Sequence, residues 1–108
     1  MTEQEKIQKG LLTIDLKRHV VTLDKREIKL SHKEFCLLCL FAKHPGWVFT
    51  KEQIYENIYY MDTIGDIDNM IFCLIHSLRK KIETDLRHPQ YIHTVRGIGY
   101  KLKLVSEE

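Results

Sequence analysis

The sequence of 108 residues lacks any stretch of about 18 apolar residues that could cross a membrane. Its acidic start also lacks the apolar run of a secretory signal. It contains only two prolines and five glycines, and we find no internal repeat or low-complexity segment. Because 44% of the residues are hydrophobic and 30% are charged, the composition predicts one globular domain with one modest core and no membrane contact.

Cysteine is also scarce, and the three thiols are Cys36, Cys39 and Cys73. An odd number without a signal sequence predicts free thiols in the reducing cytoplasm. Cys36 and Cys39 have the spacing of half a zinc site, which His32 or His44 could complete. A structural zinc site normally needs four ligands, and no second pair stands at a suitable spacing. We therefore expect no metal or other cofactor, and a thiol or metal sensor is kept as an alternative.

Catalytic groupings are absent from the sequence as well. The six histidines are scattered, and neither His76 nor His93 has an obvious Ser or Cys nucleophile with an orienting acid. The acidic residues between positions 62 and 68 fit a loop and the start of a helix. We therefore expect a protein that is not an enzyme.

A long periodic stretch from about Asp66 to Glu83 predicts a helix. Its apolar residues recur three or four positions apart and so share one face: Ile67, Ile71, Ile75, Leu78 and Ile82. The other face carries few charges and consists of Asn69, Cys73, His76 and Lys80, flanked by Phe72, Ser77 and Arg79. By itself this pattern also fits a buried core helix with a solvated basic end.

The residues after Pro89 alternate as in a β-hairpin. Tyr91, His93 and Val95 lie on one side of the first strand, and alternate residues return from Tyr100 to Leu104. Gly97 and Gly99 supply the turn. We interpret the helix as an element presented to DNA and the hairpin as a wing that reaches a neighbouring groove.

A net charge of only +2 conceals an uneven distribution of charge. Residues 79–103 contain seven basic and two acidic side chains, a balance of +5. Residues 52–68 contain five acidic side chains and no basic one. The first segment is suited to a polyanion and the second is not.

The N-terminal part reads as three short strands between residues 11 and 30, after a loose tail at residues 1–9. A capping box of Ser31 and Glu34 begins a buried helix that extends to about Lys43. A short strand is expected at residues 47–49. Thr50 caps a further helix that ends near Tyr59, and its N-terminal amides, with Thr50 and Lys51, could hold a DNA phosphate. An ordinary exposed cap explains the same residues equally well.

Four separated segments resemble the winged-helix effector domain of OmpR/PhoB-type two-component response regulators: residues 30–38, 46–50, 78–83 and 89–100. The resemblance covers about residues 10–104 and leaves a C-terminal tail at 105–108. It implies an α+β fold, a winged helix-turn-helix with an N-terminal antiparallel sheet, three helices and a C-terminal β-hairpin wing. The periodicity described above supports the same fold independently.

The resemblance also implies the function and partners of the domain. It predicts sequence-specific binding to double-stranded DNA and transcription regulation in the cytoplasm, with two copies on direct repeats about 10 bp apart. The loop at residues 60–65 is where RNA polymerase can be touched in this family. A receiver domain of about 120 residues would accompany the effector domain in a complete response regulator.

Specific residues are expected to contact DNA in this arrangement. Phosphate contacts are assigned to Arg79, Lys80 and Thr94, a minor-groove or backbone contact to Arg96, and a bracing or phosphate contact to Tyr100. The residues expected to face bases are Asn69, Phe72, Cys73, His76 and Ser77.

This segment departs from the family, which commonly carries basic or polar residues at the positions of Asn69, Leu74, His76 and Ser77. Arginine contacts to guanine are therefore scarce, and contact of Phe72 or Cys73 with thymine methyl groups becomes the favoured base readout. The alternative is a winged-helix protein-interaction module with weak or non-specific DNA binding.

Overall fold

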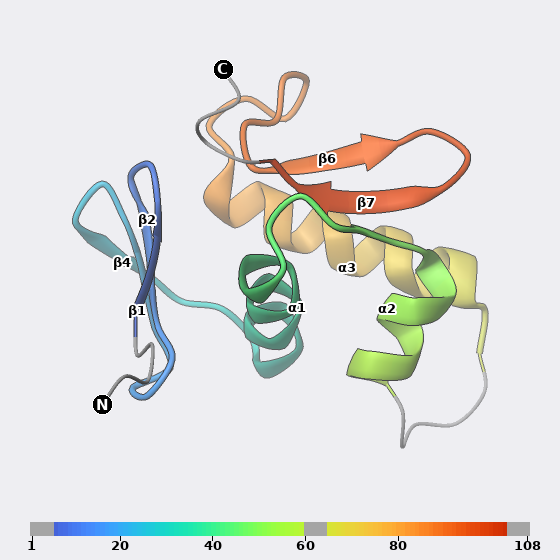
Figure 1. Cartoon of the computed structure of the whole chain (residues 1–108), viewed down its shortest axis with the longest axis horizontal. Coiled ribbons are helices and arrows are strands. Elements are labelled where there is room, and N and C mark those ends of the chain that lie inside the picture. Colours follow the sequence, from blue (N-terminus) through green and yellow to red (C-terminus); the bar gives the residue numbers. More distant parts are fainter. Residues whose placement is uncertain (1–5, 60–64, 104–108) are drawn as a thin grey trace.

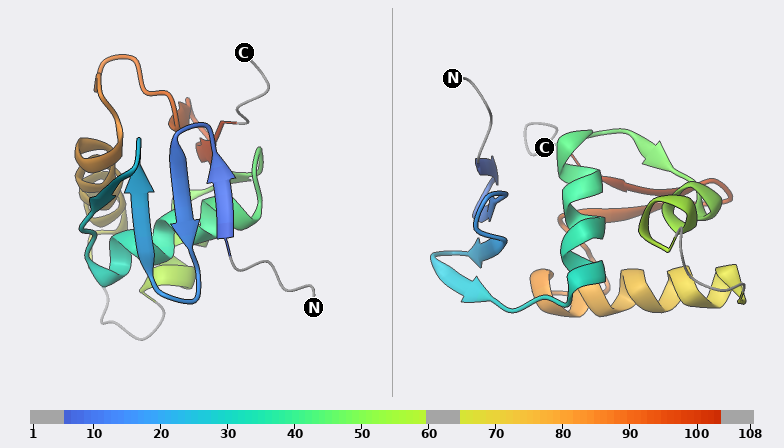
Figure 2. Two further views of the ribbon diagram at one scale, coloured as in Figure 1. Left: turned by 90° about the vertical axis from the view of Figure 1, so that its left-hand side faces the viewer. Right: turned by 90° about the horizontal axis from the view of Figure 1, so that it is seen from below.

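The computed structural model describes residues 6–59 and 65–103. Four antiparallel strands come first in the chain, in the spatial order β1-β2-β3-β4: β1 (Lys6–Lys9), β2 (Leu12–Asp15), β3 (Val20–Leu23) and β4 (Arg26–Ile28). In Figure 1 this sheet stands apart from the wing, with α1 (His32–Lys43) between them. Figure 2 shows α1 against one face of the sheet, with α2, the wing and most of α3 on the other side of α1.

The first strand corrects the prediction of a loose tail at residues 1–9. Residues 6–9 pair with β2, and Ile7 lies opposite Ile14 in the ladder. Ile7 is only 7% exposed, so its burial in the core gives the segment a reason to be ordered. Gly10, with φ +60°, turns the chain into β2. The three strands expected between residues 11 and 30 are confirmed.

A tight turn joins β3 to β4 and fixes their register. Asp24 and Lys25 both have positive φ, +53° and +69°. Two consecutive residues of this kind form the type I′ turn, whose twist matches that of the two paired strands.

The helix α1 has the predicted bounds and lies at the centre of the core. Ser31 and Glu34 form the expected capping box at its start. Leu37, Leu38 and Phe41 are fully buried. Since α1 contacts α2 (Lys51–Ile58), α3 (Ile67–Ile82) and β7 (Gly99–Leu102), it is the support on which the C-terminal elements rest.

The C-terminal half places a three-stranded sheet over α3 (Figure 1). Its order is β5-β7-β6, with β5 at Val48–Phe49 and β6 at Ile92–Val95. Short β5, predicted at residues 47–49, therefore ties the wing to the start of α2. Within residues 6–59 and 65–103, no helix is long and apolar enough to cross a membrane.

The apolar stripe predicted for α3 faces the core. Ile71, Ile75, Leu78 and Ile82 are at most 1% exposed, and Ile67 is partly buried against the same cluster. Leu74, at 8% exposed, joins them although the sequence did not place it there. Asp66 caps the N-terminus and Glu83 the C-terminus, so the bounds of this helix are also as predicted.

Candidate nucleic-acid interface

The face of α3 turned away from the core holds most of the residues expected to face bases. Asn69, Phe72, Cys73 and His76 are exposed, and Lys80 follows them one turn later. The Phe72 side chain is 61% exposed. This part of α3 presents amide, aromatic, thiol and imidazole groups, and its first basic side chain comes only at its C-terminal half.

Contacts within this face hold some of its side chains in place. The backbone amide of Asn69 donates to Asp66 Oδ1 at 3.2 Å, which is the N-cap contact. One turn later, Cys73 Sγ lies 3.8 Å from Asn69 Oδ1. The rings of Phe72 and His76 are parallel to within 2°, with centroids 6.2 Å apart.

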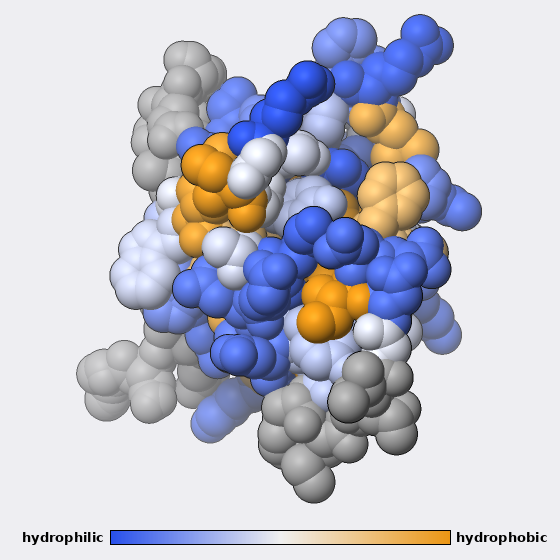
Figure 3. Space-filling view, turned by 90° about the vertical axis from the view of Figure 1, so that its right-hand side faces the viewer, coloured by the Kyte–Doolittle hydropathy of each residue, from blue (hydrophilic) through white to orange (hydrophobic). Residues whose placement is uncertain are grey.

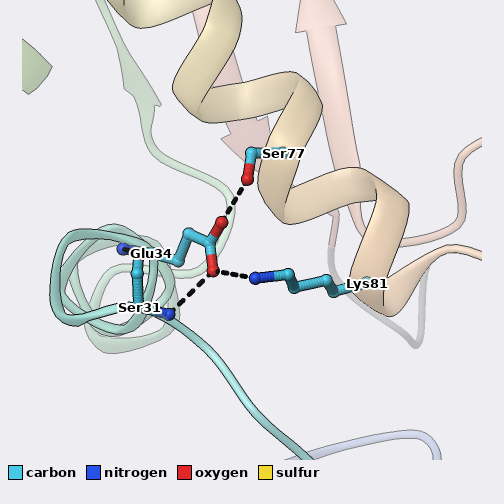
Figure 4. Close-up of polar contacts among 4 residues, drawn as sticks. All are labelled: Ser31, Glu34, Ser77 and Lys81. Carbon is cyan, nitrogen blue, oxygen red and sulfur yellow. Dashed lines mark hydrogen bonds and ion pairs between the residues drawn. The ribbon is translucent and has the colours of Figure 1, made fainter.

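Ser77 departs from its predicted place among the base-facing residues. Its hydroxyl donates to Glu34 Oε2 on α1, so it faces the interior rather than the groove side (Figure 4). Lys81 Nζ lies 2.7 Å from the other carboxylate oxygen of Glu34, which also accepts the Ser31 amide at 2.8 Å. Since Glu34 is only 4% exposed, this cluster fixes α3 against α1.

Arg79 also differs from its expected role as a phosphate contact. Its Nε and Nη2 donate to the carbonyl of Ile92 at 3.2 and 2.9 Å, and Nη2 donates to Thr94 Oγ1 at 2.8 Å. Its guanidinium lies 5.8 Å from the centre of the Tyr100 ring, which belongs to β7 of the wing. Burial lowers the pKa of Arg79 from its usual value, opposed by nearby Tyr100 and Glu83. Arg79 thus attaches the wing to α3.

Glu83 makes a second attachment between the same two elements. Its buried carboxylate accepts three consecutive backbone amides, from Gln90 at 2.6 Å, Tyr91 at 2.9 Å and Ile92 at 2.8 Å. These residues lead into β6, so the last turn of α3 sets where the wing begins. Three charge-assisted hydrogen bonds to one carboxylate are a strong local constraint.

The tip of the wing is a turn from Val95 to Ile98, closed by a hydrogen bond from the Ile98 amide to the Val95 carbonyl. Gly97 occupies its third position with φ +79°, as a type II turn requires. Gly99 lies beyond the turn, in β7, which corrects its predicted place. Arg96 is exposed beside Ile98, which is 58% exposed.

Figure 3 shows the end of the molecule where the wing tip and α3 meet α2. Its hydrophobic areas are separate and surrounded by hydrophilic surface. This pattern differs from the broad apolar patch typical of a protein-docking surface.

Comparisons with known proteins agree with this architecture, in which a helix packs one face into the core and holds a β-hairpin wing. The family profile described as "Transcriptional regulatory protein, C terminal" matches residues 25–102. This chain belongs to that family. The effector domain has relatives among curated proteins, such as the transcriptional regulatory protein YcbL of Bacillus subtilis, 45% identical over 91 residues, 84% of this chain and 40% of YcbL. The chain spans less than half the length of the curated relatives it matches.

Solved structures confirm the winged-helix fold. The response regulator DrrB of Thermotoga maritima, an OmpR/PhoB homologue, superposes with a TM-score of 0.86 at 31% identity, over 94% of this chain and 45% of DrrB. The DNA-binding domain of RstA from Klebsiella pneumoniae, solved in complex with the RstA box, gives a TM-score of 0.82 at 30% identity, over 93% of this chain and 98% of that domain. The effector domain is thus of the OmpR/PhoB type.

The start of α2 offers the effector domain only part of the expected phosphate site. Thr50 and Gln53 form a reciprocal capping box, which occupies two of the amides at this N-terminus. Lys51 Nζ lies 2.8 Å from Asp68 Oδ1, and this contact raises the pKa of Lys51. Because Asp68 already balances its charge, Lys51 is less available to a phosphate than the sequence suggested.

His93 and Cys39, which the sequence left as possible functional residues, have surroundings that suit a structural role. Burial and the nearby Lys103 lower the pKa of His93, opposed by Glu83, and this shift favours the neutral imidazole, which is a weaker partner for a phosphate. Burial raises the pKa of the Cys39 thiol to about 11, which leaves little reactive thiolate for a redox sensor. Among the residues that the structure describes, no group of three or more His, Cys, Asp or Glu side chains could hold a metal ion.

Because Glu34 is held by Lys81, Ser77 and Ser31, we expect the stability of the effector domain to depend on pH. Burial opposes the charge of Glu34, but Lys81, Ser77 and the Ser31 amide outweigh it and hold the pKa of the carboxyl below its usual 4.5. The stabilisation is therefore present above pH 4.5 and lost as the pH falls through the lowered pKa. We expect Glu34→Gln to cost about 2 kcal/mol at neutral pH and less in acid, measured by urea unfolding.

An exposed acid gives the control for this measurement. Glu27→Gln, on β4, is expected to change the free energy of unfolding by less than about 0.5 kcal/mol. An equal cost of Glu34→Gln at pH 7 and in acid would show that the charge of Glu34 does not stabilise the fold.

Proposed function

We propose that this effector domain binds a specific sequence of double-stranded DNA, with α3 in the major groove and the wing tip in the adjacent minor groove. The observation that carries the proposal is the rigid joint between the two elements. Arg79 and Glu83 both connect the last turns of α3 to β6. As Figure 1 shows, the wing tip and the N-terminal end of α3 lie at the same end of the molecule.

Roles follow from exposure and chemistry. Lys80, Thr94 and Arg96 contact phosphates or the minor groove, and Tyr100 braces the wing through its contact with the Arg79 guanidinium. Four side chains of α3 face base edges: Asn69, Phe72, Cys73 and His76. Arg79 and Ser77 act instead inside the domain, by holding the wing and α1.

The wider context of the domain is proposed from its relatives. We place it in the cytoplasm as the effector part of a two-component response regulator, accompanied by a receiver domain and bound as two copies to direct repeats. The RstA domain, which has this fold, is seen on its DNA box. The predicted contact of residues 60–65 with RNA polymerase lies almost wholly outside the described residues and stays a proposal.

Salt dependence tests the electrostatic part of the proposal. If Arg79, Lys80, Thr94 and Arg96 all contacted phosphates, about four contacts would give a log–log slope of affinity against salt of about −3.6. Because Arg79 is committed to the wing and Thr94 carries no charge, about two cationic contacts remain, from Lys80 and Arg96, and the expected slope is about −1.8. Arg96→Ala is expected to make the slope shallower by about 0.9, measured by fluorescence anisotropy on a labelled duplex.

Arg87→Ala is the matched control, because Arg87 is an exposed arginine in the connector between α3 and β6. It should leave the slope unchanged. A slope near zero for the wild-type domain would refute groove binding through the basic wing.

A further inference from the structure

The exposed Phe72 ring is the most unusual side chain on the α3 face. Phe72 is the sixth of sixteen residues in α3 and is 61% exposed, although the opposite face of the same helix is packed into the core. Single exposed hydrophobic residues are common on protein surfaces. Here, however, the residue lies in the middle of the face proposed to enter the groove.

The surroundings of Phe72 favour bases over phosphates as its target. Asn69 and His76, one turn away on either side, and the adjacent Cys73 are exposed and form no ion pair among the described residues. The first basic side chain of the exposed face comes at Lys80, two turns later. An aromatic ring makes no favourable contact with a hydrated phosphate. When it packs against another apolar group, water leaves both apolar surfaces and the contact is favourable.

We propose that Phe72 determines sequence specificity by packing its ring against the 5-methyl group of a thymine in the major groove, an inference that rests on the DNA-binding function proposed above. The thymine methyl is the apolar group that base pairs display on their major-groove edges. The ring of Phe72 lies parallel to that of His76, whose centroid is 6.2 Å away, and this neighbour limits the orientations open to it.

The other apolar candidates fit this role less well. Cys73 Sγ is turned toward Asn69 Oδ1, at 3.8 Å, so its polar contact lies within the helix. Ile98, although 58% exposed, lies at the wing tip, which is assigned to the minor groove. The minor groove does not display the thymine methyl.

Two random-sequence duplex pools test the proposal, one containing thymine and the other deoxyuridine in its place. Deoxyuridine keeps every hydrogen-bonding group and every charge and removes only the methyl. The wild-type domain is expected to enrich a motif from the thymine pool that contains at least one position where thymine is preferred. From the deoxyuridine pool it should enrich the same motif without that preference. A single replacement at that position should weaken binding by about fourfold, the effect of about one buried methyl group.

Variants assign the effect to the Phe72 ring. Phe72→Ala should enrich from both pools the motif that lacks the thymine preference, and replacing that thymine with deoxyuridine should not change its affinity. Phe72→Leu keeps an apolar contact and should retain the preference for thymine. Leu11→Ala is the matched control, because Leu11 is 60% exposed and lies in the turn between β1 and β2. It should behave as the wild type.

The possible failures are distinguishable. If the wild-type domain enriched the same motif equally from both pools and no position were sensitive to deoxyuridine, the proposed role of Phe72 would be wrong. Specific DNA binding would still hold. A methyl effect that persists in Phe72→Ala would assign the readout to another residue. Enrichment from neither pool would overturn both this inference and the proposed function.

Discussion

Glu83→Gln is expected to lower the free energy of unfolding by about 3 kcal/mol. The Glu83 carboxylate is only 8% exposed and accepts three backbone amides, from Gln90, Tyr91 and Ile92. A glutamine offers one acceptor oxygen in place of two and turns an amide donor toward the same N–H groups. At least one buried donor is then left unpaired, which costs about 1–3 kcal/mol for each group.

Urea unfolding followed by circular dichroism measures this effect, with Glu56→Gln as the control. Glu56 is an exposed acid on α2, and its change should be within about 0.5 kcal/mol of zero. If Glu83→Gln were as stable as the control, the carboxylate would not be holding the start of β6. Because the wing would also be loosened, we expect Glu83→Gln to bind DNA more weakly under conditions in which it is folded.

Gly99→Ala is expected to be at least as disruptive, for a steric reason. A Cβ at position 99 would collide with the Phe49 carbonyl oxygen and would lie 2.8 Å from the carbonyl carbon and 3.0 Å from Thr50 Cα. All three atoms belong to the backbone of β5 and the α2 cap, so no side chain can move to make room. We expect a loss of about 3 kcal/mol or more, since β5 must separate from β7.

Gly97 provides a control within the same wing. It has φ +79°, but a Cβ there would meet no atom within 4 Å. Gly97→Ala should therefore cost only about 1 kcal/mol, the strain of a positive φ. Thermal unfolding of both variants separates the two causes. If Gly97→Ala and Gly99→Ala lowered the stability equally, the close approach of Phe49 to Gly99 would not contribute to the cost.

The sequence predicted those features that depend on short-range patterns. Capping boxes at Ser31 and Thr50 are formed by residues three positions apart, so both helix starts were visible. The stripe from Ile67 to Ile82 repeats every three or four residues and gave α3 its bounds. By contrast, β1 was missed, because four residues with a single buried side chain, Ile7, carry little periodic signal.

The site was predicted less completely because its key contacts join distant residues. Glu34 contacts Ser77 and Lys81, which are 43 and 47 positions away in the sequence. No pattern near Glu34 shows that this capping residue would also bind two side chains of α3. The sequence does contain a local signal for the role of Glu83. Glu83 follows Lys80 and Lys81 at the C-terminal end of α3, where an acid is unfavourable for the helix dipole. Such a local conflict indicates a tertiary partner, here the amides before β6.

The most direct measurement is selection from a random-sequence duplex library at two salt concentrations, with the wild-type domain beside Arg96→Ala. We predict enrichment of a repeated motif by the wild type and loss of that enrichment in Arg96→Ala. Binding without enrichment would contradict base readout by α3 and leave non-specific attraction to the basic wing. No binding at low salt would contradict DNA recognition itself and favour a winged helix that binds another protein.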